Sequence, residues 1–374
     1  MSILSPPGCP EDELQVGLTA RSARGAAPAR RAAQAGFTLV ELMVAVALGL
    51  FLVAVMGTVY LGSKATYRSL DAMARLQENG RFAIDTIGAD LRMAGFRGCL
   101  GYGKATSLVN TLNAPNATLY NFAVAVGASR RSGASWAPAL DTAIAGLATA
   151  PNAAGDVLTI RRPVGQGRAL IAEMADANAA LTVSGPSPFR TGDLLMVADC
   201  TGAAVFQASA ATAAGGAVQH VAGSGLTPDM STGSLGKPFL QDAMVYRMET
   251  VTYYLAPSAR VGKTGVMSLW AFVNPAYDGT PQPAELVTGV ERLAVTLGVD
   301  GNDDRNADQY LAPGAVPDWT AVVSARIELL LAGTQDGVTT APQKYTFGGM
   351  TYNPTDRKLR TSMMLVSSLR NSLP

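Results

Sequence analysis

An apolar run from Phe37 to Leu61, FTLVELMVAVALGLFLVAVMGTVYL, constrains this chain more than any other feature. These 25 residues exceed the roughly 20 that a helix needs to cross a bilayer, so the run predicts a membrane-spanning helix. Positive charge on one flank keeps that flank in the cytoplasm. The arginines that precede the run are Arg21, Arg24, Arg30 and Arg31. The amino end is therefore expected in the cytoplasm.

Glu41 is the single charged residue of the run. A carboxylate at lipid depth costs several kcal/mol, and such residues usually have a partner. Gly36 stands directly before the run. An ordinary secretory signal has its small residues after the apolar core. Cleavage at Gly36 would instead keep the hydrophobic helix, and Glu41 with it, in the product.

The composition bounds the function. Of the 374 residues, 29 are basic and 28 acidic, so no basic excess indicates a nucleic-acid partner. The 39 glycines and 21 prolines are typical of many turns and short strands rather than of a helical bundle.

Loss of the segment before the run would remove Cys9. The two cysteines left, Cys99 and Cys200, would be able to pair in an oxidising compartment.

The chain divides into four segments: residues 1–36, 37–61, 62–96 and 97–374. The third segment contains no proline and predicts that the helix continues past the membrane, with an apolar stripe that Gln77 and Gly80 interrupt. The stripe comprises Leu70, Met73, Ile84, Ile87, Leu91 and Ala94. Opposite charges three or four residues apart occupy the other face: Asp71 with Arg75, Glu78 with Arg81, and Arg81 with Asp85. Such pairs suit a solvated face of a helix that lies on a domain.

The fourth segment is mostly strands and turns. Alternation of apolar with polar residues is typical of a sheet with one covered face. The expected strands are 156–163, 168–174, 192–200, 204–209, 244–256, 266–273, 290–300, 322–333 and 359–371. The Ala/Gly-rich stretch 208–225 is expected to be a loose loop. The fold class is therefore α+β, with a long amino-terminal helix, half in the membrane and half packed on a β-rich domain.

The segment GFTLVELMVAVALG, residues 36–49, resembles the type III signal of type IV prepilins and type II secretion pseudopilins. The resemblance implies that residues 1–36 are a leader and that a prepilin peptidase cuts between Gly36 and Phe37. The same peptidase would methylate the new amino group of Phe37. The resemblance also implies a partner for Glu41, the terminal amine of a neighbouring filament subunit, because a buried carboxylate is tolerated best beside an opposite charge.

Further stretches resemble the PilW minor pilins of the type IV pilus. They are LQENGRFAIDTIGADLRMAGFRGC, TGDLLMVADC, LVTGVERLAVTLGVD and RKLRTSMMLVSSLRN. The resemblance implies a pilin-like protein that spans the inner membrane once, has a periplasmic domain and later sits at the pilus tip. Its function would be to help initiate pilus assembly, without catalytic activity or a cofactor. Its partners would be other minor pilins, the major pilin and a tip adhesin.

The same resemblance implies a disulfide between Cys99 and Cys200, since both match cysteines of the PilW pattern. For a loop of about a hundred residues, the chain-entropy model gives about 4–5 kcal/mol of stabilisation. The bridge would tie the helix to the sheet. The alternative is two unpaired buried thiols.

An acidic stretch, DGNDDRNAD, has the alternating oxygen-bearing side chains of a calcium loop. These side chains are Asp300, Asn302, Asp304, Asn306 and Asp308. Arg305 stands where the sharp-turn glycine belongs, and Leu311 stands where the bidentate glutamate belongs. The alternative is a solvated turn between strands, so calcium is the one cofactor left open.

Two other functions remain open. A type II secretion pseudopilin would share the signal and Glu41, whereas the PilW-like stretches favour the pilus. A membrane-anchored periplasmic enzyme would need a clustered polar pocket. His220, the single histidine, has no cysteine or histidine at metal-ligand spacing and no G-x-S-x-G motif before it. It is expected to be a solvated or hydrogen-bonded loop residue.

Overall fold

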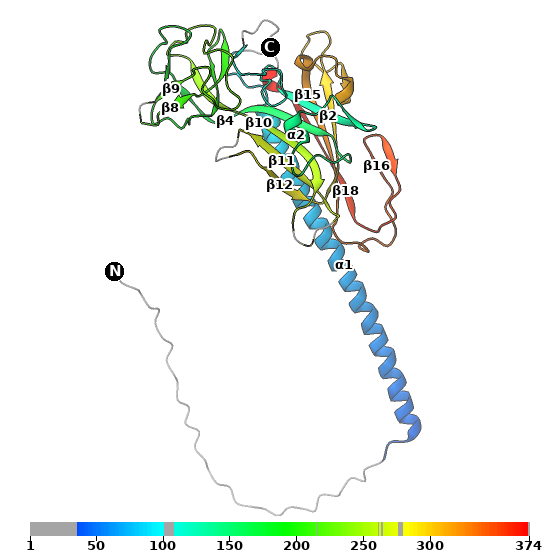
Figure 1. Ribbon diagram of the computed structural model, residues 1–374. Helices are drawn as coiled ribbons and strands as arrows, with labels where there is room; N and C mark the ends of the chain where they lie inside the picture. The colour runs from blue at the N-terminus through cyan, green and yellow to red at the C-terminus, as the bar shows by residue number, and fades with distance from the viewer. Residues whose placement is uncertain are drawn as a thin grey trace, which may run out of the picture. The chain divides into compact units, whose positions relative to one another are not determined.

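The computed structural model describes residues 36–100, 108–214, 216–260, 262, 265–275 and 280–372. A long helix, α1 (Leu39–Met93), leads into a β-rich region that also carries the short helix α2 (Thr142–Ala145) (Figure 1). Three 3-10 turns are η1 (Pro313–Ala315), η2 (Trp319–Ala321) and η3 (Arg370–Ser372). The chain divides into two units, residues 1–61 and 62–374. The α+β class predicted from the sequence is confirmed.

The second part of α1 is the amphipathic helix that the sequence predicts, but its buried stripe begins later. The buried residues of α1 are Leu76, Gly80, Ala83, Ile87, Gly88 and Leu91. Leu70 is 66% exposed and Met73 is 37% exposed, so the first part of the predicted stripe was wrong. Periodicity identifies the face of a helix that packs, but not the turn at which packing begins.

Gly80 was predicted to interrupt the stripe, and this was also wrong. Gly80 is buried and faces side chains of β15 and β18. A Cβ at this position would lie 2.4 Å from Met363 Sδ and 3.0 Å from Leu331 Cδ1. The missing side chain therefore allows α1 to lie directly on the sheet.

The larger sheet has nine strands in the order β1-β7-β6-β10-β4-β2-β3, with β11 pairing β10 and β12 pairing β11. The pair β1–β7 is parallel and the others are antiparallel. The strands are β1 (Leu108–Asn110), β2 (Val126–Ser132), β3 (Ser135–Ala137), β4 (Val157–Ala169), β6 (Leu194–Ala198), β7 (Ala203–Gln207), β10 (Met244–Pro257), β11 (Met267–Asn274) and β12 (Pro283–Thr288).

The second sheet has four antiparallel strands in the order β14-β13-β15-β18. They are β13 (Val290–Val299), β14 (Gln309–Leu311), β15 (Val322–Ala332) and β18 (Arg360–Ser368). Two small sheets are added. The hairpin of β16 (Tyr345–Phe347) and β17 (Met350–Tyr352) forms one, and the other consists of β5 (Leu181–Thr182), β9 (Ala217–Gln219) and β8 (Ala210–Ala211).

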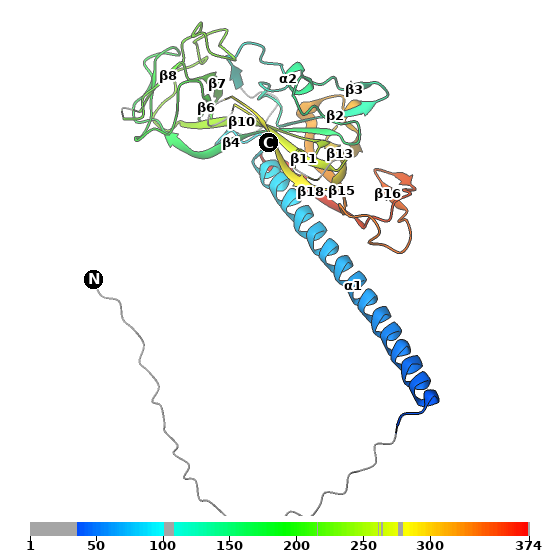
Figure 2. The same ribbon diagram turned by 60° about the horizontal axis from the view of Figure 1, so that its bottom comes forward.

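Most of the predicted strands are present, but two segments differ from the prediction. Only Arg168 and Ala169 of the expected strand 168–174 belong to a strand, the end of β4. The stretch 208–225, expected to be a loose loop, contains β8 and β9. Figure 1 shows both strands, and Figure 2 shows β8, at the end of the domain away from β16. Tertiary pairing therefore orders a segment whose composition predicts a loop.

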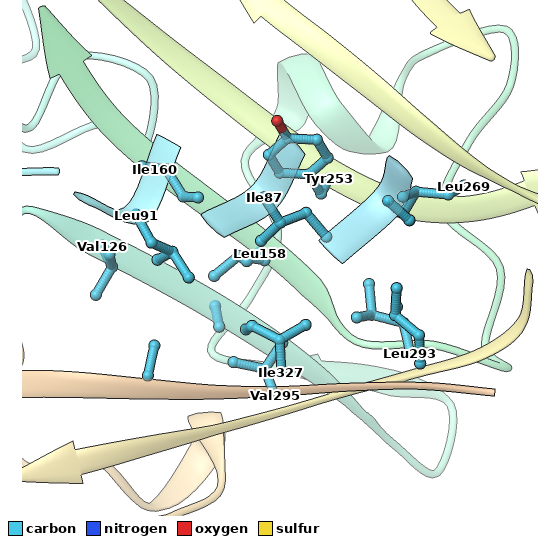
Figure 3. Packing of buried hydrophobic residues seen from close by; sticks show 14 of the residues in the cluster. Ile87, Leu91, Val126, Leu158, Ile160, Tyr253, Leu269, Leu293, Val295 and Ile327 are labelled. Carbon is cyan, nitrogen blue, oxygen red and sulfur yellow. The ribbon is translucent and has the colours of Figure 1, made fainter. Parts of the chain in front are cut away.

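Two of the hydrophobic cores share the long strand β10. The first surrounds α1. Figure 3 shows Ile87 of α1 with Tyr253 and Leu158 of the larger sheet and Val295 and Ile327 of the four-stranded sheet around it. The second core lies around β6 and β7. It includes Phe206, Phe239, Leu195, Val197 and Val245.

Candidate functional site

The site predicted from the sequence lies at the start of α1. The Thr38 hydroxyl accepts a hydrogen bond from the Glu41 N–H at 3.3 Å, and the Thr38 carbonyl accepts one from the Leu42 N–H at 3.1 Å. Thr38 is thus the N-cap, with a glutamate three residues later, as in a capping box. In lipid each satisfied N–H group matters more than in water, because no solvent replaces a missing acceptor.

This role of Thr38 was not predicted from the sequence, although the T-x-x-E spacing is a recognisable signal. Glu41 lies in the first turn of α1. A carboxylate there is favoured by the positive end of the helix dipole. No ion pair of Glu41 is present among the residues that the structure describes. The arrangement can therefore offer its charge to a cation on another molecule.

The apolar side chains around Glu41 are exposed; Phe37, for example, is 84% exposed. The helix is long and apolar enough to cross a membrane, with a mean hydropathy of 2.7 over its most apolar 18 residues. Residues 1–35, with Cys9 and the four arginines, lie outside the described residues. The leader, the cut at Gly36–Phe37 and the methylation of Phe37 therefore stay predictions.

A polar network that the sequence analysis did not predict holds α1 to the domain. The Tyr253 hydroxyl donates to Asp90 Oδ2 at 2.7 Å. Arg162 Nε lies 2.8 Å from Asp90 Oδ1, an ion pair in which the N–H is not aimed along the line to the oxygen. Glu249 lies 3.8 Å from Arg162 and 2.7 Å from Arg247.

The chemistry of this network follows from its burial. Burial raises the pKa of the Tyr253 hydroxyl above its ordinary value, and the Asp90 charge and hydrogen bond act in the same direction. Tyr253 therefore remains a proton donor to Asp90. Burial also raises the pKa of Glu249, against the opposing effect of its arginine partners. The residues come from α1, β4 and β10, so no local sequence pattern could reveal the network.

The structure contains the Cys99–Cys200 disulfide, with the two Cα atoms 4.9 Å apart and a sequence separation of 101. Cys99 follows the end of α1, and Cys200 follows β6 of the second core. The buried Arg97 side chain also donates to the carbonyl of Phe122 at 3.2 Å. The bridge thus ties the end of the helix to the second core.

The acidic loop uses its carboxylates to hold its own backbone. The Asp300 carboxylate accepts four backbone N–H groups at 2.7–3.3 Å, those of Asn302, Asp303, Asp304 and Arg305. Burial alone would raise the pKa of Asp300, but these donors outweigh it and hold the pKa below its ordinary value. Within the described ranges, no three His, Cys, Asp or Glu side chains converge as metal ligands would. Calcium binding by this loop stays a prediction.

His220 is buried and hydrogen-bonded rather than solvated. Its Nδ1 lies 2.8 Å from the Gly233 carbonyl oxygen, and its Nε2 lies 2.8 Å from the Ala179 carbonyl oxygen. The ring also packs edge-on against Phe206, with the ring centroids 5.4 Å apart. His220 therefore joins loops of the second core.

Two family models match the chain. Residues 31–57, which include the start of α1, match the prokaryotic N-terminal methylation motif. This match and the long helix followed by a β-rich domain define a type IV pilin-like protein. Residues 252–371 match the model of Type IV Pilus-assembly protein W. The last third of the chain is therefore similar to the PilW minor pilins, and its start carries the methylation motif of prepilins.

Among solved structures, a type IV-like pilin from Thermus thermophilus matches with 11% identity and a TM-score of 0.31. The match covers 80% of this chain and 98% of that pilin. No curated protein sequence matches the chain significantly.

Proposed function

We propose that this chain is a minor pilin of the PilW type that helps to initiate assembly of a type IV pilus and remains at or near the pilus tip, without catalytic activity of its own. One observation carries the proposal. The helix α1 runs unbroken from Leu39 to Met93, with an exposed apolar start and a later part that forms the centre of a domain core. A single helix can thus serve first as a membrane anchor and then as a filament element.

The proposed mechanism begins in the inner membrane. Prepilin peptidase removes residues 1–36, and Phe37 receives a methyl group on its new positive amine. Glu41 then docks against the Phe37 amine of a neighbouring subunit. Two charges that are costly in lipid when alone stabilise each other when paired, provided that the geometry is good. The Thr38 cap keeps the first turn formed at the docking point.

The proposed site of action of the domain is the periplasm and then the cell surface. The Cys99–Cys200 bridge supports this, because disulfides persist in oxidising compartments. The match of residues 252–371 to the PilW model favours a pilus over a secretion pseudopilus. The proposed partners are other minor pilins, the major pilin and a tip adhesin.

Processing is tested with Gly36→Asp in the full-length chain. We expect a full-length precursor, because the peptidase requires a small residue before the cut. The measurement is mass spectrometry of the amino-terminal peptide, which should begin at methylated Phe37 in the unaltered chain. Efficient trimming of the variant, or an unaltered chain that begins at Met1, would contradict the assignment.

Docking is tested with Glu41→Ala, for which we expect normal trimming but about tenfold less protein in sheared pili, since the charge pair is lost. Thr38→Val separates the charge from the cap, because it removes the capping hydrogen bond but leaves the carboxylate in place, and it should lower incorporation less than Glu41→Ala does. Immunoblots of cells and pili give the incorporated fraction. Equal incorporation of Glu41→Ala and the unaltered chain would refute the docking role.

A further inference from the structure

β18 is an edge of the four-stranded sheet, and its free side carries a row of main-chain groups. The Leu369 N–H donates to the Val323 carbonyl at 2.8 Å, and the Gly333 N–H donates to the Leu359 carbonyl at 2.8 Å. In the β15–β18 register these bonds place odd-numbered residues of β18 in hydrogen-bonded pairs. Because the pattern alternates, even-numbered residues direct their N–H and C=O groups away from β15. The first of these residues, Arg360, already donates its N–H to Gln343 Oε1 at 2.8 Å. The open row is formed by the other four, Ser362, Met364, Val366 and Ser368.

Little in the part of the chain that the structure describes fills this open row. Among the hydrogen bonds of the described residues, the one that reaches it is from Ser367 Oγ to the Ser368 carbonyl, at 3.4 Å. Unpaired N–H and C=O groups at the period of a strand are a template for another strand. A helix or a single side chain could not fill the row, because neither presents donors and acceptors at the spacing of a strand.

The other edges of the two large sheets are protected in ways that β18 is not. β1, β3 and β14 are three residues long, and β12 begins with Pro283 and carries Glu285. Short length, proline and charge are the usual defences of an edge. β18 has nine residues in unbroken register with β15. It contains no proline, and its one charged residue, Arg360, is the first of the strand and has a buried side chain that pairs with Glu291 and Asp356.

The side chains along the free edge define what fits there. Met364 is 59% exposed and Val366 is 52% exposed, with exposed serines at either end of the row. Neighbouring side chains on one face of a sheet stabilise each other when both are apolar. The fitting segment is therefore extended and uncharged, with two apolar side chains at alternate positions and polar residues outside them.

We propose that β18 docks another pilus subunit, which adds one such extended segment of about seven residues to the sheet. The inference rests on the proposed function for the identity of the partner as a pilus subunit. The docking strand would extend the four-stranded sheet to five strands. Main-chain hydrogen bonds would supply the affinity, and Met364 and Val366 would supply the selectivity.

A second copy of this chain fits less well than a different subunit. β18 and α1 run in the same direction, since Gly80 lies against Met363 and Gly88 lies against Leu365. Just beyond the end of β18, Asn371 Nδ2 donates to the carbonyl of Arg92, near the end of α1, at 3.1 Å. Antiparallel pairing of two β18 strands would therefore turn their α1 helices in opposite directions. Two chains anchored in one membrane have these helices parallel.

The test uses the full-length chain in piliated cells, with the photoreactive residue p-benzoylphenylalanine in place of Ser362. Illumination is expected to give an adduct with a different pilus subunit, and mass spectrometry should locate the crosslink in an extended segment. Met364→Lys and Val366→Lys should each lower the adduct about tenfold, because charge blocks an edge. Met350→Lys is the matched control, since Met350 is 61% exposed but lies in the β16–β17 hairpin. It should leave the adduct unchanged.

The same samples report the amino terminus and the Cys99–Cys200 bridge, which verify processing and folding. A processed, disulfide-bonded chain that gives no adduct overturns the inference, as does an adduct of the chain with itself. Equal loss of the adduct with Met350→Lys also overturns it. A chain that begins at Met1 but still crosslinks to a different subunit supports strand docking and contradicts the proposed function.

Discussion

The hydrogen bond between Asp90 and Tyr253 should stabilise the folded domain, and the costs of losing its two partners should not add. Asp90→Ala leaves the Tyr253 hydroxyl, in a residue that is 1% exposed, without its acceptor. An unsatisfied buried polar group costs about 1–3 kcal/mol. The same change removes a partner of Arg162, although Glu249 remains 3.8 Å away. We expect a total loss of about 3–4 kcal/mol in the free energy of unfolding.

Tyr253→Phe separates the two contributions. In the unaltered chain it removes a hydrogen bond to a charged acceptor and should cost about 2 kcal/mol. In the Asp90→Ala background it removes the unsatisfied hydroxyl, so its cost should fall to about zero. The double-mutant cycle should therefore give a coupling energy of about 2 kcal/mol.

The assay is urea unfolding of the full-length chain in detergent micelles, followed by tryptophan fluorescence. The three tryptophans, Trp136, Trp270 and Trp319, all lie in the β-rich unit, so the signal reports that unit. Asp85→Ala is the matched control, because Asp85 is an exposed residue of α1 whose 3.5 Å pair with Arg81 is also exposed. Exposed pairs contribute about 0–1 kcal/mol.

Costs of Asp90→Ala and Tyr253→Phe that add within about 0.5 kcal/mol would refute the reasoning. A loss with Asp85→Ala as large as that with Asp90→Ala would also refute it. In either case the network would not be what holds α1 to the sheet.

Two further predictions concern the disulfide and acid stability. Cys200→Ser should lower the free energy of unfolding by about 2–5 kcal/mol and abolish the gel-mobility shift on reduction; free alkylation of both thiols in the native protein would contradict this. Hydrogen bonds from Arg360 lower the pKa of Asp356 from 3.8 to about 2. This contribution to stability is complete above the unfolded pKa and is lost as the pH falls from about 4 through about 2. Arg360→Gln should reduce the loss in the free energy of unfolding between about pH 4 and pH 2. An unchanged loss over this pH range would count against the Asp356–Arg360 pair.

Several features of this protein could be predicted because their signals are local. The apolar run, Gly36 and Glu41 are neighbours in the sequence, and α1 forms there as expected. Strands β10, β13 and β15 have long apolar or alternating patterns and were predicted at nearly their observed bounds. In each case the residues that carry the signal also form the element.

Other features depend on residues that are distant in sequence. Leu70 was predicted to pack on the domain and is exposed, whereas Gly80 was predicted to interrupt the packing stripe and is buried. The strands β15 and β18 decide where α1 touches the sheet, and both are distant from α1 in sequence. The strands β8 and β9 form in an Ala/Gly-rich stretch because β5 supplies a partner. Asp90, Arg162 and Tyr253 carry no shared pattern and meet through the packing of α1 on β4 and β10.

The sequence by itself determined that a membrane-length helix with one acid near its start leads into a β-rich domain, because hydrophobicity and periodicity act over neighbouring residues. The tertiary structure alone decided which turn of α1 packs, that the sulfurs of Cys99 and Cys200 meet, and that β18 is left as an open edge. The physical reason is that strand order and helix docking depend on contacts across the whole domain. A sequence pattern states what each segment prefers, but not which segment it will meet.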